Sequence, residues 1–381
     1  MTSIESTSPN RVLPGGTIGI LGSGQLGRMM SAAAKQMGYR VHIYSANEDS
    51  PAGQVSDIEC VGSLTDLDSI KNFAQRVDVI TIETENVPID SFNTAAEFAP
   101  AYPGIPALQT CQNRGLEKKF LVKHEIPTCD FRIVRSLEDL RTACQQIMPG
   151  ILKTTTGGYD GKGQARIQTK ADIDQAWEDL KTNEAILEQI IHFECEFSVV
   201  GYRRDDGAAN TYPPIVNDHA DGILDISTSP GHLPEPVAKS AMQMVLKMME
   251  KFGSVGVLTV EFFYADGKAL VNEIAPRPHN SGHLTIEGHV TSQFEQHIRA
   301  VCGLPLGSIH QHRPVAMVNL LGDLWDNGAP DWSSILDIPE TKLHLYGKET
   351  AKPKRKMGHI TSTADTVDQA RQNAVDARKS P

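Results

Sequence analysis

The pattern of strands and helices changes near residue 112, and this change limits the folds that the chain can adopt. Before it, short apolar runs alternate with helical stretches, which is typical of a parallel sheet covered by helices. We therefore expect a Rossmann-like α/β domain over residues 15–112, after a disordered tail at 1–14 that is rich in Ser, Thr and Pro. The predicted strands are 17–21, 40–44 and 77–81, and the predicted helices are 25–37 and 66–75.

Beyond residue 112 the chain reads mainly as strands, which indicates an α+β arrangement in place of a continued parallel sheet. A capping box, Ser292-Gln293-Phe294-Glu295, begins a helix that runs to about residue 301. We expect a central domain over 113–305 and a smaller C-terminal domain over 306–381. Predicted strands are 131–134, 151–154, 164–167, 185–189, 196–201, two within 257–274, and two near 314–320 and 342–346; further helices are 115–124 and 136–148.

The 381 residues include 36 Lys and Arg against 47 Asp and Glu, which gives a net charge of −11. This balance argues against a nucleic-acid-binding protein, which needs a basic surface, but it allows phosphorylated small molecules as ligands. The chain has no apolar run of about 18 residues and no secretory signal, so we expect no membrane partner. Six cysteines without a C-x-x-C pair fit reduced thiols in a cytoplasmic protein.

A first glycine-rich turn, Gly22-Ser23-Gly24-Gln25-Leu26-Gly27, lies between a predicted strand and a predicted helix. Such a turn lets a phosphate approach the free N–H groups of the helix start. A dinucleotide-binding fold carries Asp or Glu at the end of its second strand, where this chain has Ser45. In order of preference, the interpretations are a phosphate-bearing substrate, a tight turn without a ligand, and NAD binding.

A second glycine-rich segment runs from Lys153 to Gln164, and four of its residues between 157 and 163 are glycines. The backbone N–H groups of such a loop can wrap around anionic oxygens. Lys153 is at the end of a predicted strand and could reach a phosphate. The segment does not match the Walker A pattern, and its alternative interpretation is an ordinary hairpin loop.

Glu261 and Glu273 form a candidate metal site on a predicted hairpin. A three-residue loop centred on Gly267 would set the two glutamates opposite each other on one face. Two like charges in contact are unfavourable without a cation, and Mg²⁺ takes one or two carboxylates together with nucleotide phosphates. The alternative is a solvated charged hairpin, and the apolar residues around Glu261 argue against it.

Two further segments carry groups that suit anionic ligands. Residues 275–283, with the sequence APRPHNSGH, form a predicted rigid polar loop in which Arg277 can bind phosphate or carboxylate through its planar fork. We interpret His283 as a hydrogen-bonded loop histidine. Residues 348–356 carry five Lys and Arg against one Glu, which suggests a phosphate partner in an otherwise acidic protein, with a solvated basic loop as the alternative.

Together these segments resemble the 5-(carboxyamino)imidazole ribonucleotide synthetases of the ATP-grasp superfamily. The resembling motifs, in the family's order, are GQLGRM at 24–29, ETENVP at 83–88, GGYDGKGQ at 157–164, NEIAPRPHNSGH at 272–283 and YGK…RKMGH at 346–359. The resemblance implies an ATP-grasp fold, with ATP between two antiparallel sheets of the central domain. It also implies a purine-biosynthesis ligase that uses ATP, Mg²⁺ or Mn²⁺, and bicarbonate. Through carboxyphosphate, such a ligase would carboxylate the amine of 5-aminoimidazole ribonucleotide.

The resemblance also implies roles for individual residues. Nucleotide contacts would be Arg114, Lys153, Gly158, Tyr159, Asp160, Gly161, Lys162, Gly163, Gln164, Glu196, His219, Asn272 and Glu273, with Glu188, Gln189, Ile190 and Ile191 at the adenine. The Mg²⁺ ligands would be Glu261 and Glu273. Substrate contacts would be Gly24, Gln25, Leu26, Glu83, Glu85, Tyr159, Asp160, Arg277, His279, Asn280, Lys348 and Arg355, and the catalytic set would be Lys153, Asp160, Arg277 and Asn280. A homodimer that passes its product to the mutase of the next step is also implied.

The chain departs from the family where R-P-G before Arg355 is replaced by Lys352-Pro353-Lys354. Lys352 keeps the charge but loses the bidentate fork of Arg. Three alternatives stay open. They are an ATP-grasp ligase of another nucleotide, such as a formate-dependent glycinamide ribonucleotide transformylase, an NAD-dependent oxidoreductase, and a non-catalytic nucleotide-binding regulator.

Overall fold

The computed structural model describes residues 11–157, 163–326 and 328–379. Its first sheet has four parallel strands in the order β3-β2-β1-β4. All four residues of β4 and nearly all of β1 and β2 are buried, as expected for a parallel sheet with helices on its faces. The elements are β1 Thr17–Leu21, α1 Gln25–Gln36, β2 Arg40–Ser45, η1 Gly53–Val55, β3 Ile58–Val61, α2 Leu67–Ala74, β4 Val79–Ile82, α3 Ile89–Ala96 and α4 Ile105–Cys111.

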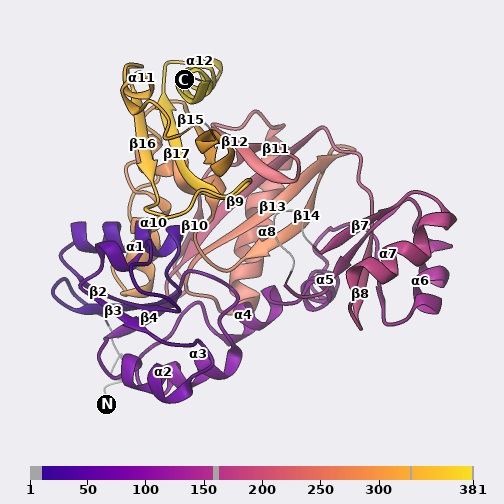
Figure 1. Cartoon of the computed structure of the whole chain (residues 1–381), viewed down its shortest axis with the longest axis horizontal. Helices are drawn as coiled ribbons and strands as arrows, with labels where there is room; N and C mark the ends of the chain where they lie inside the picture. The colour runs from indigo at the N-terminus through magenta and orange to yellow at the C-terminus, as the bar shows by residue number, and fades with distance from the viewer. Residues whose placement is uncertain (1–10, 158–162, 327, 380–381) are drawn as a thin grey trace, which may run out of the picture.

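A second, antiparallel sheet forms a small lobe at the right of Figure 1. Its strand order is β5-β8-β6-β7, and α6 and α7 cover one face through a core that includes Leu140, Leu152 and Leu187. The helix α5 lies between this small lobe and the rest of the molecule (Figure 1). The elements are α5 Arg114–Lys123, β5 Phe131–Val134, α6 Leu137–Cys144, β6 Gly150–Thr154, β7 Gln164–Ile167, η2 Lys170–Asp172, α7 Ile173–Leu180 and β8 Ala185–Gln189.

The third sheet is antiparallel throughout and has the order β14-β13-β9-β11-β12-β15-β17-β16, with β10 beside β9. The long helix α8 packs Val245 and Met249 against it, next to Phe197 and Leu258. Its strands are β9 Cys195–Arg203, β10 Ala209–Thr211, β11 Ile215–Ala220, β12 Ile223–Ser229, β13 Gly256–Ala265, β14 Lys268–Ala275, β15 Val315–Leu321, β16 Thr341–Leu345 and β17 Lys356–Thr363. The remaining helices are α8 Glu235–Phe252, η3 Asn280–Leu284, α9 Thr285–Gly288, α10 Gln293–Val301, η4 Gly322–Trp325, α11 Trp332–Leu336 and α12 Val367–Lys379.

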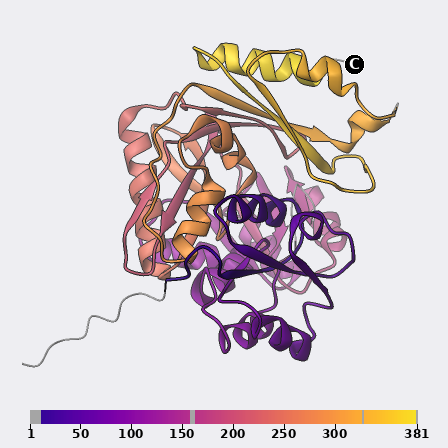
Figure 2. The same cartoon turned by 90° about the vertical axis from the view of Figure 1, so that its left-hand side faces the viewer.

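The strands of the predicted C-terminal domain continue this third sheet, because β15 pairs with β12. This pairing covers an edge of β12 that would otherwise expose unpaired backbone groups. Figure 2 shows α12 lying over these last strands, where Ala370, Ala374 and Ala377 pack against Val318 and Ile360. The predicted domain limits at 112 and 305 stay predictions.

Several predicted elements differ from the observed ones. The helix predicted to reach residue 148 ends at Cys144, and Gln145 is its C-cap. Ser292 caps α10 by accepting from the Glu295 N–H, but Glu295 turns to Arg299, so only half of the predicted capping box forms. The elements that were not predicted include the strands β3, β11, β12 and β17 and the helices α3, α4, α7, α8 and α12. Among the described residues, no helix is both long and apolar enough to cross a membrane.

Candidate active site

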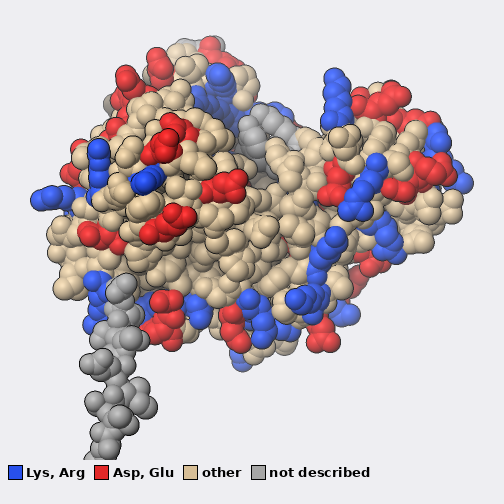
Figure 3. Space-filling view, turned by 90° about the horizontal axis from the view of Figure 1, so that it is seen from below, with Lys and Arg blue, Asp and Glu red and all other residues tan. Residues whose placement is uncertain are grey.

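A cleft of about 980 Å³ lies where the small lobe, the third sheet, the first domain and residues 348–356 meet. Seen from below, the outline is notched between the small lobe and the rest of the molecule, and charges of both signs alternate over this face (Figure 3). The described lining of the cleft carries eight Lys and Arg against four Glu, the reverse of the balance of the whole chain. They are Arg114, Lys153, Arg277, Lys348, Lys352, Lys354, Arg355 and Lys356, with Glu85, Glu196, Glu261 and Glu273.

The two candidate metal ligands are paired across the β13–β14 hairpin. At the tip the strands are joined by a two-residue turn, Asp266-Gly267, and both residues have positive φ. A register shift next to Glu261 leaves Asn272 as an extra residue, so that Glu261 pairs with Glu273. The predicted pairing is confirmed, but the predicted three-residue loop is wrong, because a two-residue turn plus a bulge gives the same pairing. Asn272 and Glu273 both line the cleft although they are consecutive.

The electrostatics of this pair suit a divalent cation. Burial, and then the nearby charge of Glu273, raises the pKa of Glu261 to about 7. Two carboxylates that resist joint ionisation are stabilised by a cation with a preference for oxygen ligands. No group of three or more His, Cys, Asp or Glu among the described residues could hold an ion alone. The pair therefore fits an ion that takes its other ligands from phosphate and water.

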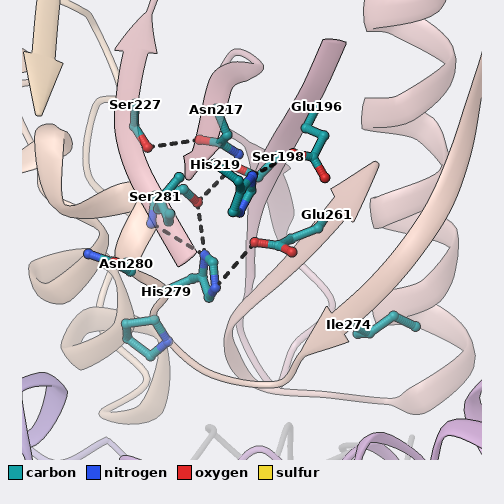
Figure 4. Close-up of polar contacts among 12 residues, drawn as sticks. Glu196, Ser198, Asn217, His219, Ser227, Glu261, Ile274, His279, Asn280 and Ser281 are labelled. Carbon is teal, nitrogen blue, oxygen red and sulfur yellow. Dashed lines mark hydrogen bonds and ion pairs between the residues drawn. The ribbon is translucent and has the colours of Figure 1, made fainter. Parts of the chain in front are cut away.

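Two histidines contact carboxylates that line the cleft, one of them Glu261 (Figure 4). His219 Nδ1 lies 2.6 Å from Glu196 Oε2. Burial opposes protonation of His219, but its hydrogen bond to Glu196 outweighs this effect, and the pKa of the imidazole is raised. His279 Nε2 lies 3.5 Å from Glu261 Oε1, and burial lowers the pKa of His279 well below its usual value. The contact with Glu196 thus favours the protonated form of His219, whereas burial favours the neutral ring of His279.

On the small-lobe side, Lys153 Nζ donates to Glu188 Oε2 at 2.6 Å. Lys118 Nζ lies 3.8 Å from the other oxygen of Glu188. Burial opposes ionisation of Glu188, but the two lysines outweigh it and lower the pKa of that carboxyl. Glu188 is buried and is not part of the described cleft lining, so in this structure it orients Lys153 from behind.

Lys118 is a residue that the sequence reasoning missed. Its side chain is 1% exposed, and its ammonium donates to Thr128 Oγ1 at 2.8 Å and to the carbonyl oxygen of Asn272 at 3.1 Å. It therefore ties helix α5 to the bulge beside Glu273. No sequence motif marks it, because a single lysine in an amphipathic helix usually lies in solvent.

Arg277 and Glu85 form an ion pair across the cleft between the loop after β14 and the loop after β4. Burial opposes ionisation of Glu85, but the charge of Arg277 outweighs it and lowers the pKa of the carboxyl. Both residues line the cleft. Arg277 Nη1 also donates to the carbonyl of Pro278 at 3.2 Å.

The first glycine turn holds one of the chain's own carboxylates. Glu83 Oε2 accepts from the Gly27 N–H at 3.4 Å, and a Cβ at Gly24 would come within 3.0 Å of the same carboxylate. Burial raises the pKa of Glu83, and the preferred interpretation, in which a substrate phosphate occupies this helix start, stays a prediction. Ser45 is buried and hydrogen-bonded to Ser23 at 2.7 Å, which fills the position of the acid in a dinucleotide site.

The basic segment adopts a defined turn at the cleft. Lys354, where the family resemblance implies a glycine, has a φ of 64°, the left-handed conformation that glycine adopts easily. Its backbone N–H donates to Asp323 Oδ2 at 2.7 Å. A lysine therefore adopts, at this position, the backbone conformation that favours glycine. Lys348 Nζ donates to the carbonyl of Lys356 at 2.6 Å, and Arg355 Nη1 donates to that of Thr350 at 2.8 Å.

Asn280 is held by a second residue that the sequence reasoning missed. Asn280 and Asn319 exchange amide hydrogen bonds of 3.1 and 2.8 Å, and Asn319 also donates to the Leu224 carbonyl at 2.7 Å. Asn319 belongs to β15, so the last part of the third sheet fixes a residue of the cleft. His283 is buried and bonded to Gln293, as expected, but it lies in η3 and not in a loop.

The structure brings most of the predicted residues to one cleft. Those in its lining are Gln25, Leu26, Glu85, Arg114, Lys153, Gly163, Gln164, Glu196, His219, Glu261, Asn272, Glu273, Arg277, His279, Asn280, Lys348 and Arg355. Gly24, Glu83, Glu188, Gln189, Ile190 and Ile191 are not among its lining residues. Gly158, Tyr159, Asp160, Gly161 and Lys162 lie outside the described residues.

Family models match three successive parts of the chain. They are the ribonucleotide synthetase pre-ATP-grasp domain over residues 16–112, the ATP-grasp domain over 119–294 and the phosphoribosylaminoimidazole carboxylase C-terminal domain over 315–373.

Two curated relatives and two solved structures extend this match. The N5-carboxyaminoimidazole ribonucleotide synthase of Bacillus subtilis is 42% identical over 360 residues, 94% of each chain. The bifunctional purine synthesis protein purC/E of Dictyostelium discoideum is 43% identical, over 91% of this chain but only 37% of its own length. An ADP complex of N5-carboxyaminoimidazole ribonucleotide synthetase superposes with a TM-score of 0.91 at 41% identity, covering 97% of this chain and 98% of the other.

The second structure is the Aspergillus clavatus N5-carboxyaminoimidazole synthase in complex with ADP and 5-aminoimidazole ribonucleotide. It superposes with a TM-score of 0.87 at 32% identity, covering 96% of this chain and 99% of the other. Identity of this extent over nearly the whole length, together with the shared fold and cleft, shows the family. The chain belongs to the N5-carboxyaminoimidazole ribonucleotide synthases, the ATP-grasp ligases of purine synthesis.

Proposed function

We propose that the chain carboxylates the amine of 5-aminoimidazole ribonucleotide with bicarbonate at the expense of ATP. Bicarbonate would attack the γ-phosphorus of ATP to give ADP and carboxyphosphate, and the amine would then take the carboxyl group with release of phosphate. The observation that carries this proposal is a single cleft with the Glu261–Glu273 pair and eight cationic side chains in its lining. Such a lining suits the simultaneous binding of two phosphorylated ligands and a carboxylate.

ATP is assigned to the part of the cleft between the small lobe and the third sheet. Lys153, oriented by Glu188, would meet a phosphate, and Arg114 would lie beside it. The Glu196–His219 pair would bind the ribose hydroxyls through the free carboxylate oxygen. Residues 188–191 and residues 158–162 of the glycine loop, which lie outside the described residues, stay predictions for this nucleotide site.

The divalent cation, Mg²⁺ or Mn²⁺, is assigned to Glu261 and Glu273. When bound, it would neutralise charge on the transferring phosphoryl group. The chain's own contribution is to present two paired carboxylates at the cleft and to supply Asn272 next to them. This donor set fits the ion, since both groups are hard oxygen ligands.

The ribonucleotide is assigned to the opposite side of the cleft. Arg277, anchored by Glu85, would stabilise negative charge that develops on the carboxyl group. Lys348 and Arg355 would bind the ribonucleotide phosphate, with Gln25, Leu26, His279 and Asn280 around the base and ribose. Asp160, which lies outside the described residues, stays the candidate acceptor of the amine proton. The catalytic set is thus Lys153, Asp160, Arg277 and Asn280.

Three further assignments complete the proposal. The enzyme would act in the cytoplasm as a homodimer and pass its product to the mutase of the next step. Support for the location comes from six cysteines without a disulfide among the described residues. No observation favours one of the alternative activities, and the filled Ser45 position argues against the NAD-dependent one.

One assay tests the activity. Phosphate release from Mg-ATP with bicarbonate is expected to rise strongly when 5-aminoimidazole ribonucleotide is added. Glu261→Gln is expected to lower kcat at least 100-fold, whereas the control Glu235→Gln, on the exposed start of α8, leaves it unchanged. Equal phosphate release with and without the ribonucleotide would contradict the assignment. Stimulation by glycinamide ribonucleotide with formate would identify the alternative ligase.

A further inference from the structure

A line of buried polar side chains leads to the candidate metal site (Figure 4). Ser227, Asn217 and Ser198 come from three neighbouring strands, and Ser281 comes from η3; all four are at most 3% exposed. Ser227 Oγ bonds Asn217 Oδ1 at 2.8 Å, Asn217 Nδ2 bonds Ser198 Oγ at 3.1 Å, and Ser198 Oγ bonds Ser281 Oγ at 2.7 Å. The line then reaches His279, whose Nδ1 lies 2.9 Å from Ser281 Oγ.

The chemistry of these groups gives the line one direction. The amide nitrogen of Asn217 donates to Ser198, and the single proton of the Ser198 hydroxyl is donated to Ser281. The proton of Ser281 is then left for His279 Nδ1. The backbone N–H of Ser281 also donates to Nδ1, at 3.3 Å. Because Nδ1 accepts, the single ring proton of the neutral imidazole lies on Nε2, which faces Glu261.

The backbone of His279 is held as firmly as its ring. The side-chain amide of Gln293 accepts from the His279 N–H at 3.0 Å and donates to the His279 carbonyl at 2.7 Å. Gln293 is fully buried, and a Cβ on Gly282 would come within 2.4 Å of its Oε1. Neither the chain nor the side chain of His279 therefore turns without breaking buried hydrogen bonds.

We infer that His279 is a positioning residue, held by this line of hydrogen bonds as the Nε2–H tautomer so that it donates to Glu261 and fixes that carboxylate for a divalent cation. The inference rests on the proposed role of Glu261 as a metal ligand. It gives His279 a task other than the substrate contact that the family resemblance implies. Outer groups that orient metal ligands typically change metal affinity 10- to 100-fold when they are replaced.

Nitrogen NMR of the nucleotide-free protein, labelled with [¹⁵N]histidine, reads the tautomer directly. The His279 signals are those lost in His279→Gln. In the unmodified protein we expect a protonated Nε2 and an unprotonated Nδ1 at neutral pH. In Ser281→Ala the two nitrogen shifts should move toward each other, because Nδ1 loses its hydroxyl donor. A protonated Nδ1 in the unmodified protein, or identical spectra in Ser281→Ala, would overturn the inference.

Thr259→Val is the matched control. Thr259 is fully buried on β13, two residues from Glu261, and its hydroxyl has no hydrogen-bond partner among the described residues. The control is expected to leave the His279 signals unchanged. If Ser281→Ala does not fold, Ser281→Cys keeps the volume and weakens the donor, and an intermediate movement of the shifts is expected.

Calorimetry then tests the link to the metal. Ser281→Ala is expected to bind Mn²⁺–ADP about tenfold more weakly, with unchanged affinity for ADP in the presence of a chelator. Equal weakening of both ligands, or the same loss in Thr259→Val, would overturn the positioning role. If Mn²⁺ does not strengthen ADP binding to the unmodified protein, the proposed metal site is wrong, while the NMR result still decides the tautomer.

Discussion

Single buried residues join parts of the chain that are far apart in sequence. His297 on α10 accepts from the Val257 N–H at 3.0 Å through Nδ1, and its Nε2 bonds Thr81 Oγ1 at 2.8 Å. The ring thus connects β13 with β4 of the first domain. Burial lowers the pKa of His297 to about 3, so the ring is neutral in the folded protein. In the unfolded chain a histidine titrates near 6.5.

The pH dependence of stability follows from this difference. Below about pH 6.5 the unfolded chain binds a proton that folded His297 does not, so stability falls as the pH falls from there toward 3. The expected contribution is about 1.4 kcal/mol per pH unit once the unfolded form is protonated. His297→Gln should be less stable at pH 7 but lose less on acidification. Urea unfolding at pH 7, 6 and 5 measures this, and parallel losses in both proteins would contradict it.

Lys354 gives a second prediction for one residue. It holds a positive φ that costs a lysine about 1 kcal/mol but costs a glycine little. Lys354→Gly is therefore expected to raise the free energy of unfolding by up to about 1 kcal/mol. Lys352→Gly is the matched control, because this neighbouring exposed lysine is not among the residues with positive φ. Thermal unfolding of the two variants should give opposite signs, and a stabilising Lys352→Gly would count against the explanation.

At the scale of elements, contacts from helix α5 hold the bulge of β14 that presents Asn272 and Glu273. The bulge in β14 brings Asn272 and Glu273 to the cleft together, and its carbonyl is held by Lys118 from α5. The neighbouring Glu117 accepts from the Ile274 N–H at 3.0 Å, and burial raises the pKa of this carboxyl to about 8. Helix α5 thus fixes the strand segment on both sides of Glu273.

Lys118→Met tests this support. The variant keeps the approximate length of the side chain but leaves the carbonyl of Asn272 without its donor. It also removes the positive charge that lies 3.8 Å from Glu188. We expect a loss of about 3 kcal/mol in unfolding free energy. We also expect a KM for ATP about tenfold higher, since the bulge and Lys153 both shift. Lys119→Met, on the exposed side of the same helix, should change neither quantity. A stability loss with an unchanged KM would limit Lys118 to a structural role.

At the scale of the whole molecule, the first domain, the small lobe and the third sheet meet around the cleft. Residues near both ends of the chain meet there, since Gln25 and Arg355 line the same cleft. The C-terminal strands matter for this arrangement because Asn319 of β15 holds Asn280. The first domain is tied in separately, by Gln54 donating to the carbonyl of Gly347 at 3.0 Å.

Asn319→Leu tests the contribution of the C-terminal strands. It removes both amide bonds to Asn280 and leaves the Leu224 carbonyl unpaired. The expected result is a kcat/KM for the ribonucleotide at least tenfold lower, with little change in the KM for ATP, because Asn280 is assigned to the ribonucleotide side. Steady-state kinetics with each substrate varied in turn measures this. Asn373→Leu on α12 serves as the control. Equal effects on both substrates would point to general loosening of the sheet.

Local sequence patterns predicted those helices and strands whose limits depend on neighbouring residues. The alternation of strands and helices before residue 112 gave the parallel sheet, and the ends of β1, β5, β7 and β8 match their predicted limits. The helix α8 was missed although Val237, Ala241, Val245 and Phe252 follow a helical period. The Glu261–Glu273 pairing was predicted through a loop that does not exist. The turn type and the bulge compensate each other, and a sequence without its partner strand does not reveal a bulge.

The sequence by itself determined the order of the elements, the family motifs and the residues that carry charge, because these depend on neighbours a few positions apart. Only the tertiary structure decided which of those charges are used. It placed Glu83 at the first glycine turn, set Glu188 behind Lys153, and buried Lys118 against the bulge. It also ordered four buried polar residues behind His279, which contacts Glu261. The physical reason is that a buried charge or hydroxyl is stable only with partners, and its partners come from distant parts of the chain.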